Sequence, residues 1–408
     1  MPELVFDPTS ESFRGDPYAA YRRLRETAPV ARQTNHFGGN FWILSRFRDV
    51  VSVLRDPRAS VERGFPPKAP PISGDTAQDL HPLARVLRAV SRIMLFRDPP
   101  DHTRLRGLVN KAFTPRTVER LAPRIEQLVD ELLVRPQADG GMDVIADLAT
   151  PLPLLVIAEL LGVPKEDYKS LKRWSDDLAI MLDGSVALQF AGRALPSAIQ
   201  FIEYLRSVVE ARRRAPQDDL LSALIATQEA GEGLTDDEIL GTAMVLLAAG
   251  HETTTNLIGN GVLALLQHPG ERARLVADPA LLPSAVDEML RFDPPVHATS
   301  RVLPEDLEID GIVIPKRQEI GLLLAAANRD PEAFPDPDRF DVARRDNRHV
   351  AFGFGIHFCP GAGLARLEGR LAIAALLRLA PEMRLTTDTL QWRPGFLFRG
   401  VEKLPIAW

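Results

Sequence analysis

The fold of this chain is decided by one stretch near its C-terminal end, Phe352-Gly353-Phe354-Gly355-Ile356-His357-Phe358-Cys359-Pro360-Gly361. Cys359 is the only cysteine among the 408 residues. A single thiol cannot form an intrachain disulfide or a cysteine-rich metal site, so it is a small core residue, a nucleophile or the one thiolate on a haem iron. The glycines let the backbone lie flat against a bulky planar ligand, and the phenylalanines give it an apolar wall, which favours the haem ligand.

The residues after this loop predict a helix from Ala362 to Ala380, because leucines and alanines recur at helical spacing and Pro381 ends the run. Cys359 then lies just before a helix N-terminus. The helix dipole and the free N–H groups at such an end favour a thiolate over a thiol.

The pattern F-G-x-G-x-H-x-C-x-G resembles the haem-binding loop of the cytochrome P-450 monooxygenases, in their soluble bacterial type. The resemblance implies a mainly α fold, with many helices, a minor β region and a haem buried between a long distal helix and the proximal cysteine loop. It also implies haem b with Cys359 as its axial thiolate, and O2 as cosubstrate. The implied reaction inserts one oxygen atom into a lipophilic small molecule, by hydroxylation or epoxidation.

The long distal helix is predicted from Asp236 to about Gln267. Thr235-Asp236-Asp237-Glu238 is a capping box, and His268-Pro269 stops the run. Glycine and three consecutive threonines in Ala248–Thr255 are poor helix formers, so we expect a local bulge or kink there.

The same segment resembles the family motif A-G-x-[DE]-T, which implies that Thr253 takes part in oxygen activation and that Glu252 relays protons from solvent. The chemistry requires protons, because cleavage of the O–O bond needs them on the distal oxygen. His251 is adjacent to Glu252 and therefore faces another way on the helix, so we interpret it as structural or solvent-exposed. A kinked core helix with internally bonded threonines would also explain the segment.

Haem carries two carboxylates that need cationic partners. The segment Asp98–Arg106 resembles the family pattern D-P-P-x-H-x-x-x-R, which implies that His102 and Arg106, one helical turn apart, bind the propionates. By the same resemblance, Arg301 and His357 are two further partners.

A structural charge cluster is also implied. Glu288 and Arg291 lie at i and i+3 on one helix face and match the family's E-x-x-R. The resemblance pairs them with Arg339 in a later proline-rich segment. Because buried charges are costly unless they are paired, we predict a role in folding and haem retention rather than in catalysis.

The chain shows no internal repeat or linker, so we expect one domain over residues 1–408. The segment Arg58–Asp79 is rich in proline, glycine and charge and predicts a loop, and Leu83–Leu95 predicts a short helix after it. Helical periodicity then dominates to about Gln267, with breaks expected at Pro164, Pro196 and Pro216. The residues Ile309-Asp310-Gly311-Ile312 predict a hairpin. A net charge of -6 argues against nucleic-acid binding, and the absence of a long apolar stretch or a signal peptide predicts a cytoplasmic protein outside the membrane. We expect a monomer.

We expect electrons from a separate ferredoxin or flavodoxin and its reductase, fed by NAD(P)H, because the sequence contains no glycine-rich nucleotide fingerprint. Arginines near the cysteine loop suggest a basic docking face, although a solvated charge run explains them nearly as well; they are Arg344, Arg345, Arg348, Arg366 and Arg370. The substrate is expected to meet four variable segments, and an apolar intermediate of natural-product (secondary) metabolism is our expectation; the segments are Ala59–Leu95, Leu178–Phe190, Val296–Thr299 and Phe396-Leu397.

Pro360 departs from the family pattern, in which a leucine or isoleucine N–H often points at the sulfur. Proline has no N–H, so the thiolate should be a stronger electron donor and the reduction potential of the iron lower. This departure raises the question of peroxide use, although the intact Glu252-Thr253 pair favours dioxygen. A haem-thiolate enzyme that couples or dehydrogenates its substrate, a haem gas sensor and a protein without haem are competing hypotheses for the function.

Overall fold

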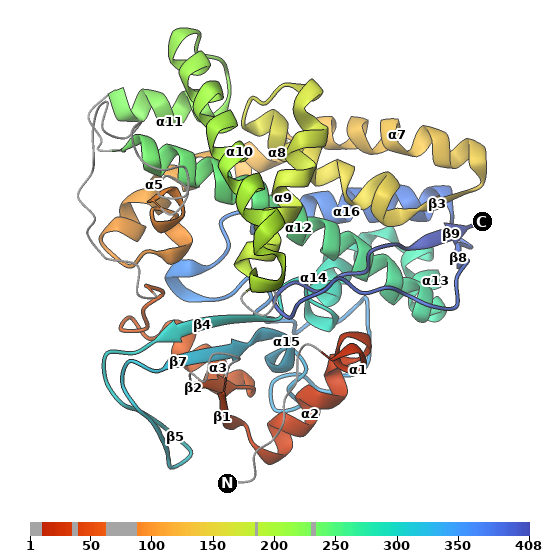
Figure 1. Ribbon diagram of the computed structural model, residues 1–408. Coiled ribbons are helices and arrows are strands. Elements are labelled where there is room, and N and C mark those ends of the chain that lie inside the picture. Colours follow the sequence, from red (N-terminus) through yellow and green to blue (C-terminus); the bar gives the residue numbers. More distant parts are fainter. Residues whose placement is uncertain (1–9, 35–39, 63–87, 184–186, 230–233) are drawn as a thin grey trace. The chain divides into compact units, whose positions relative to one another are not determined.

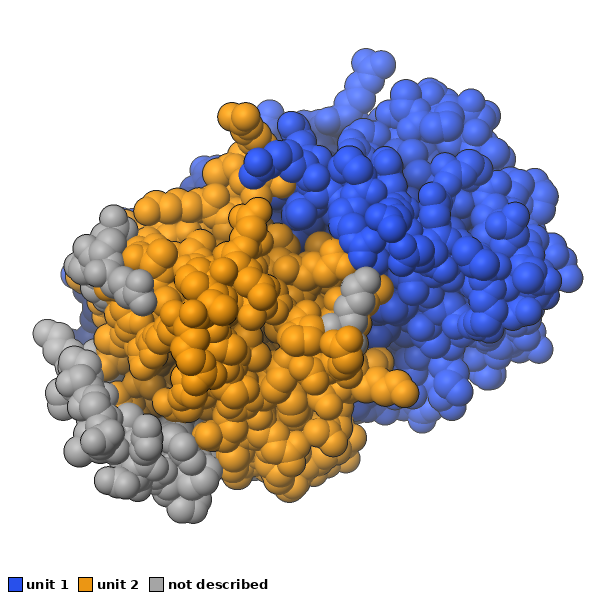
Figure 2. All heavy atoms as spheres, turned by 90° about the horizontal axis from the view of Figure 1, so that it is seen from above, with its two compact units in different colours: residues 1–60, 118–152, 253–408 blue, residues 61–117, 153–252 orange. Residues whose placement is uncertain are grey.

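The computed structural model describes residues 10–34, 40–62, 88–183, 187–229 and 234–408. The chain forms two compact units, coloured separately in Figure 2. Unit 1 comprises Met1–Ser60, Val118–Leu152 and Thr253–Trp408, and unit 2 comprises Val61–Thr117 and Pro153–Glu252. The sequence prediction of one domain over residues 1–408 remains a proposal. Calorimetry tests it, and one cooperative unfolding transition is the expected result.

Unit 1 contains the main sheet, whose strand order is β1-β2-β7-β4. The pairs β1–β2 and β4–β7 are antiparallel, whereas β2 and β7 are parallel. In Figure 1 these strands lie side by side at the lower left, with α3 beside them. Alternate residues of the strands pack with α3 into one apolar core, and the residues between them pack with α1 and α2 into a second one, so both faces of the sheet are covered. The strand bounds are β1 (Val30–Thr34), β2 (Asn40–Leu44), β4 (Ala298–Val302) and β7 (Glu319–Leu323).

The predicted hairpin is confirmed as β5 (Leu307–Ile309) and β6 (Ile312–Ile314), which pair antiparallel. Its two turn residues, Asp310 and Gly311, have φ angles of 50° and 77°. Positive φ at both central positions is what a tight hairpin turn requires, and aspartate and glycine tolerate it best.

Helices form most of the rest of unit 1, and a second small sheet joins β3 (Gly141–Asp143), β9 (Pro405–Ala407) and β8 (Arg384–Leu385). The helix α16 packs against α7 and α14. The α-helices within unit 1 are α1 (Glu11–Gly15), α2 (Pro17–Thr27), α3 (Phe47–Arg55), α7 (Ala122–Asp139), α13 (Pro269–Ala277), α14 (Leu282–Phe292), α15 (Leu324–Ala327) and α16 (Ala362–Leu379). Single turns of other helix types lie at Ile145–Ala149 (π), Pro279–Leu281 and Gly355–His357 (both 3-10).

Unit 2 is helical throughout its described part. Its core is a cluster of leucine, isoleucine, valine and alanine side chains, in which Trp174 of α9 stacks on Phe201 of α10 at 5.6 Å. The elements within unit 2 are a 3-10 turn at Met94–Phe96, α5 (Asp101–Ala112), a second 3-10 turn at Lys165–Asp167, α9 (Tyr168–Leu182), α10 (Ala187–Arg214) and α11 (Leu220–Glu229). Three helices contain the boundaries between the units: α6 (Pro115–Arg120), α8 (Pro151–Leu160) and α12 (Asp236–Gln267).

The long helix α12 has the bounds that the capping box and the histidine–proline stop predict. The backbone N–H of Glu238 donates to Thr235 Oγ1 at 3.3 Å, and the N–H of Thr235 donates to Glu238 Oε2 at 2.8 Å. This reciprocal pair gives side-chain acceptors to two N–H groups at the end of the helix. The capping box therefore fixes where this helix begins.

One predicted helix break is wrong. Pro196 lies inside the 28-residue α10, between Ala194 and Ala198, which are both 0% exposed. A proline removes one backbone hydrogen bond, but the burial of both neighbours, with Ala198 in the unit 2 core, offsets that loss and the helix continues. The short helix expected at Leu83–Leu95, like the loop expected before it, lies largely outside the described residues; the described part has helical residues at 88–91 and the 3-10 turn that follows.

None of the helices in the described part of the chain has the length and apolar character needed to span a lipid bilayer.

Candidate functional site: the cysteine loop and the acid–threonine pair

The cysteine loop in unit 1 is a tight turn that depends on two of its glycines. Gly353 and Gly355 have φ angles of 70° and 72°, a left-handed conformation that other residues adopt at a cost. At Gly355 a Cβ atom would lie 2.5 Å from the carbonyl oxygen of Leu54, so no other residue fits. The N–H of Cys359 donates to the carbonyl of Phe352 at 3.0 Å and closes the loop.

Cys359 lies just before the N-terminus of α16, as predicted. The helix begins at Ala362 with Gly361 as its N-cap, and the N–H of Ala365 donates to the carbonyl of Gly361 at 2.9 Å. The cysteine is half-buried and forms no disulfide. One thiol beside the positive end of an 18-residue helix is a donor set that fits a haem iron held by a single thiolate.

Aromatic side chains surround the loop. Phe352 meets Phe358 edge-on at 6.2 Å, and the guanidinium of Arg366 lies 4.6 Å from the Phe352 ring. Arg55 lies 4.4 Å from the ring of Phe354. The loop thus combines an apolar surface with cations at its edge, which suits a flat, apolar macrocycle with anionic substituents.

The predicted acid–threonine pair lies midway along α12. Glu252 is 2% exposed, and of the three consecutive threonines only Thr253 is half-buried, whereas Thr254 and Thr255 are 3% and 0% exposed. Thr253 is therefore the hydroxyl that a ligand can reach. The bulge expected here is not found, because α12 keeps its α-helical assignment without interruption from Asp236 to Gln267.

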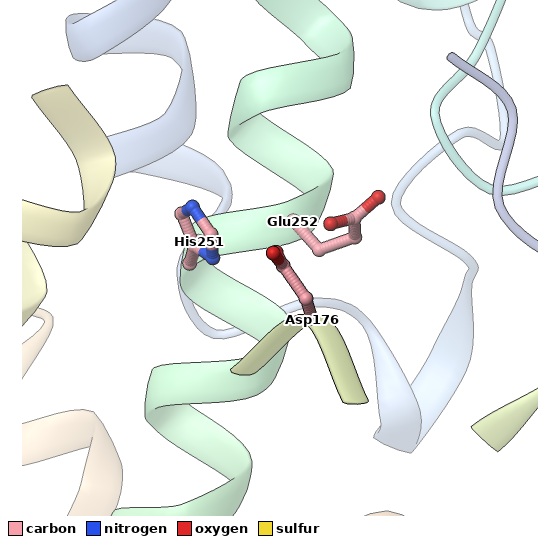
Figure 3. A group of neighbouring side chains, drawn as sticks. All are labelled: Asp176, His251 and Glu252. Atoms are coloured by element: carbon pink, nitrogen blue, oxygen red, sulfur yellow. The ribbon is translucent and has the colours of Figure 1, made fainter. Parts of the chain in front are cut away.

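His251 is buried, so the solvent-exposed interpretation of this residue is wrong and the structural one stands. Its Nδ1 lies 3.0 Å from Ser175 Oγ, and both residues are 0% exposed. Figure 3 shows a third neighbour that the sequence did not single out, Asp176 of α9. Nothing in the sequence marks Asp176, because it belongs to a helix more than 70 positions away from Glu252.

The four predicted propionate partners are placed on both units. His102, 3% exposed, is in the first turn of α5 in unit 2, and Arg106, one turn later, donates from Nε to Asn110 Oδ1 at 3.0 Å. Arg301 of β4 is 6% exposed, and its Nη1 donates to Thr299 Oγ1 at 3.1 Å and to the carbonyl of Ser300 at 2.7 Å. His357 is half-buried in the 3-10 turn of the cysteine loop. Their role toward haem remains a prediction.

The predicted charge cluster in unit 1 has a buried ion pair at its centre. Glu288 and Arg291 of α14 both have side chains that are 0% exposed, and two 2.8 Å hydrogen bonds join them. Arg291 also donates to the carbonyls of Asn328, Pro337 and Arg339, at 3.0, 2.7 and 3.1 Å. Burial lowers the pKa of Arg291, and the Glu288 carboxylate opposes that shift.

The third member of this cluster is Arg344, so the prediction of Arg339 was wrong. Arg344 Nε donates to both oxygens of Glu288, at 3.2 and 3.1 Å, and its side chain is 10% exposed. The Arg339 guanidinium is 60% exposed and lies 3.6 Å from Asp341, and only its carbonyl joins the cluster. Two arginines five positions apart look alike in sequence, and only the path of the chain decides which side chain turns inward.

The sequence motifs did not identify a buried carboxyl group, Glu368 of α16. It is 2% exposed, its Oε2 has no hydrogen-bond partner among the described residues, and burial raises its pKa to about 8. Helical periodicity places it on the apolar face of α16, which is the signal that could have identified it.

We expect Glu368 to make stability depend on pH. The pKa of Glu368 in the folded protein lies above the ordinary value of 4.5. The contribution of the protonated side chain to the free energy of unfolding is therefore fully present below pH 4.5 and is lost as the pH rises through about 8. Relative to Glu368→Gln, the wild type should lose about 1.4 kcal/mol of unfolding free energy per pH unit across that window. Urea unfolding at several pH values measures the difference. The exposed Glu382→Gln is the matched control, and an equal dependence in both variants would contradict the assignment.

Comparisons with known proteins agree with this geometry. The family model described as Cytochrome P450 matches residues 88–379. The chain is 43% identical to Cytochrome P450 107B1 of Saccharopolyspora erythraea over 406 residues, which cover 99% of this chain and 97% of the relative. It is 42% identical to Cytochrome P450 monooxygenase PikC of Streptomyces venezuelae, over 100% of this chain and 94% of the relative. With the 6-deoxyerythronolide B hydroxylase of Saccharopolyspora erythraea it shares 41% identity, over 98% of both chains.

Solved structures give the same result for the fold. The Bacillus subtilis cytochrome P450 PksS has a TM-score of 0.88 at 36% identity and covers 99% of both chains. P450BioI, solved with an acyl carrier protein that carries hexadec-9Z-enoic acid, has a TM-score of 0.88 at 38% identity and covers 98% of this chain and 100% of that one. The mainly α fold with a minor β part, predicted from the sequence, is thus confirmed. The chain therefore belongs to the cytochrome P450 family and is a P450 monooxygenase, an oxidoreductase that carries haem on a cysteine thiolate and uses O2.

Proposed function

We propose that the enzyme hydroxylates or epoxidises a lipophilic small molecule, with Cys359 as the thiolate and Glu252 with Thr253 as the groups that manage protons. The observation that carries this proposal is the placement of Cys359: a half-buried thiol in a glycine-dependent turn directly before α16. The half-buried hydroxyl of Thr253 on α12 supports it, because the neighbouring threonines are buried.

The residues present fit a haem. In this proposal Cys359 would hold the iron, and Arg301, Arg106, His102 and His357 would donate hydrogen bonds to the propionates. When bound, haem supplies the activation of O2, which protein side chains cannot perform. The protein orients the substrate, excludes water and delivers protons.

The acid–threonine pair has a separable task. Thr253 holds a proton-donating hydroxyl at the reacting oxygen, and Glu252 reloads it. The variant Thr253→Val keeps the shape of the side chain and removes the hydroxyl. We expect the amount of product per reducing equivalent to fall on the order of 10- to 100-fold. This loss is at the low end of the range for removing a positioned proton donor, because water partly replaces the hydroxyl. Hydrogen peroxide should take up the difference. Thr253→Ser is the conservative control, and normal coupling in the valine variant would contradict this role.

Electrons come, in this proposal, from a ferredoxin or flavodoxin and its NAD(P)H-dependent reductase. Arg345, Arg348 and Arg370 are exposed and flank the cysteine loop in sequence, and they support a basic docking face. The predicted contribution of Arg344 to this face is wrong, because its guanidinium binds Glu288. We also propose a cytoplasmic monomer, and light scattering after size-exclusion chromatography measures the mass.

The substrate class is proposed from the site and the relatives. Leu246, 7% exposed, and the exposed Ala249 lie on α12 just before the acid–threonine pair, and Met181 and Phe190 of the variable segment Leu178–Phe190 are half-buried. Residues 184–186 of that segment, and most of Ala59–Leu95, lie outside the described residues. Relatives are named as a 6-deoxyerythronolide B hydroxylase and a vitamin D(3) 25-hydroxylase. We propose a medium-sized apolar substrate from natural-product metabolism.

Pro360 should tune the iron. It follows Cys359 and offers no N–H toward the sulfur, so the thiolate keeps its full donor strength. We expect Pro360→Leu to raise the reduction potential, because the new backbone N–H withdraws electron density from the sulfur. A spectroelectrochemical titration measures the shift, and an unchanged reduction potential would contradict this role of Pro360.

The decisive test of the proposed function is isotopic. The purified enzyme, a surrogate ferredoxin and reductase, NADPH and a panel of lipophilic compounds are incubated under 18O2. We expect one 18O atom in the product. A desaturated or coupled product without 18O would favour a different haem-thiolate chemistry, and the absence of any product together with reversible O2 binding would favour a sensor.

A further inference from the structure

Glu252 cannot exchange protons with bulk water by itself, because it is only 2% exposed. A monooxygenase turnover nevertheless consumes protons: RH + O2 + 2 e− + 2 H+ gives ROH + H2O. Some other group must therefore connect this buried carboxylate with solvent. The described residues offer one such group in direct proximity.

Asp176 of α9 lies beside His251 and Glu252 of α12 (Figure 3). One carboxylate oxygen of each acid and one imidazole nitrogen all lie within 4.8 Å of one another, and all three residues belong to unit 2. A gap of this size is spanned by direct hydrogen bonds or by a single bridging water. The three groups can therefore pass a proton from one to the next.

The two carboxylate oxygens of Asp176 have different surroundings. Its Oδ2 accepts a hydrogen bond from Lys172 Nζ at 2.7 Å, and the aspartate and lysine side chains are 28% and 47% exposed. Its Oδ1 is buried and has no hydrogen-bond partner among the described residues. A carboxylate can take up a proton at the wet oxygen and, after rotation, present it at the dry one.

His251 fixes the geometry between the two carboxylates. Its Nδ1 is held at 3.0 Å by the hydroxyl of Ser175, and neither residue is exposed. A hydrogen bond at one ring nitrogen sets the orientation of the ring. Because Ser175 precedes Asp176 on α9, this contact also ties the turn of α9 that carries the aspartate to α12.

We propose that Asp176 is the proton inlet of this enzyme and that His251 holds it in place against Glu252. The proton leaves a carboxyl oxygen of Asp176 for the carboxylate of Glu252, directly or through one water, and Asp176 regains a proton from bulk water. No electrons move in this step. The inference rests on the proposed role of Glu252, which it extends by naming the residue that reloads it.

The test compares two neighbouring aspartates. Asp176→Asn removes the proposed inlet, whereas Asp177→Asn makes the same charge change one residue later, where the carboxylate accepts from Arg193 Nε at 2.7 Å and Ser197 Oγ at 2.5 Å. We expect D176N to lower product per NADPH on the order of tenfold, with a matching rise in hydrogen peroxide. D177N should keep normal coupling even if its stability falls, and Asp176→Glu should restore most of it. Turnover driven by added hydrogen peroxide, which brings its own protons, should be the same in D176N and wild type.

A second arm does not depend on turnover. Zn2+ is a probe for the proposed juxtaposition, because two carboxylates and an imidazole at this spacing suit its preference for oxygen and nitrogen ligands. Isothermal titration of the resting holoenzyme should give one site in wild type and D177N, and at least tenfold weaker binding in D176N.

The outcomes distinguish a failure of the proton inlet from a failure of the proposed monooxygenase function. Normal coupling in D176N with a competent wild type would overturn the inlet and leave the monooxygenase proposal intact. Equal Zn2+ affinity in D176N and wild type, or no Zn2+ site in wild type, would overturn the placement of the three groups. A wild type that forms no oxygenated product would instead contradict the proposed function, and the Zn2+ titration would still decide whether Asp176 meets Glu252.

Discussion

Cys359→Ser should abolish monooxygenation. Serine is neutral and a poor ligand for haem iron, so it cannot supply the electron donation that a thiolate provides. We expect product formation to fall to background. The carbon monoxide complex of the reduced protein should lose the strongly red-shifted Soret band of the wild type. Absorbance spectra with dithionite and carbon monoxide, together with product analysis, measure both effects.

A second substitution separates the loss of the thiolate from the loss of the fold. Cys359→His supplies a neutral nitrogen ligand at the same place, so haem should be retained while the red-shifted band and the activity remain absent. Far-UV circular dichroism of both variants should match that of the wild type. A red-shifted band in the serine variant would show that another group binds the iron and would refute the assignment of Cys359.

Glu288→Gln should cause the largest loss of stability among the single substitutions considered. The glutamine is nearly isosteric, but it leaves the guanidinium of Arg291 buried without a counter-charge and also removes the carboxylate that Arg344 binds. Breaking a buried pair from one side costs about 3–5 kcal/mol. Urea unfolding of the haem-loaded protein, followed by circular dichroism and by haem absorbance, measures the loss.

Arg344 and Arg339 provide a matched pair of arginine substitutions for the same cluster. Arg344→Ala removes two charge-assisted hydrogen bonds to Glu288 and should cost about 1.5–3 kcal/mol. Arg339→Ala removes an exposed guanidinium and should change stability by less than about 0.5 kcal/mol. The reverse order would restore the pairing that the sequence pattern implied and contradict the structure.

Local sequence signals predicted the elements that depend on local interactions. The capping box at Thr235 and Glu238 fixed the start of α12, and the Asp310-Gly311 pair fixed the hairpin turn. The same holds for the start of α16 directly after the cysteine loop. Each is determined within a few residues, by backbone conformation or by one side chain that satisfies a backbone group.

Predictions of helix breaks from single residues were wrong where distant neighbours decide whether the helix continues. Pro196 was expected to end a helix, but α10 continues through it between the buried Ala194 and Ala198. The threonines of α12 were expected to distort the helix, yet it continues because their neighbours are packed. Intrinsic propensity is a weak preference, and tertiary packing outweighs it.

The sequence by itself determined the family and the bounds of α12 and the start of α16, because each is written in contiguous residues. The roles of Cys359, Glu252 and Thr253 stay predictions that rest on the same contiguous motifs. Tertiary structure alone decided that Arg344 rather than Arg339 faces Glu288, and that Asp176 lies beside His251 and Glu252. The physical reason is that a charged side chain has the same local sequence whether it faces water or protein. Only the packing of segments far apart in the chain sets its partners and the cost of its burial.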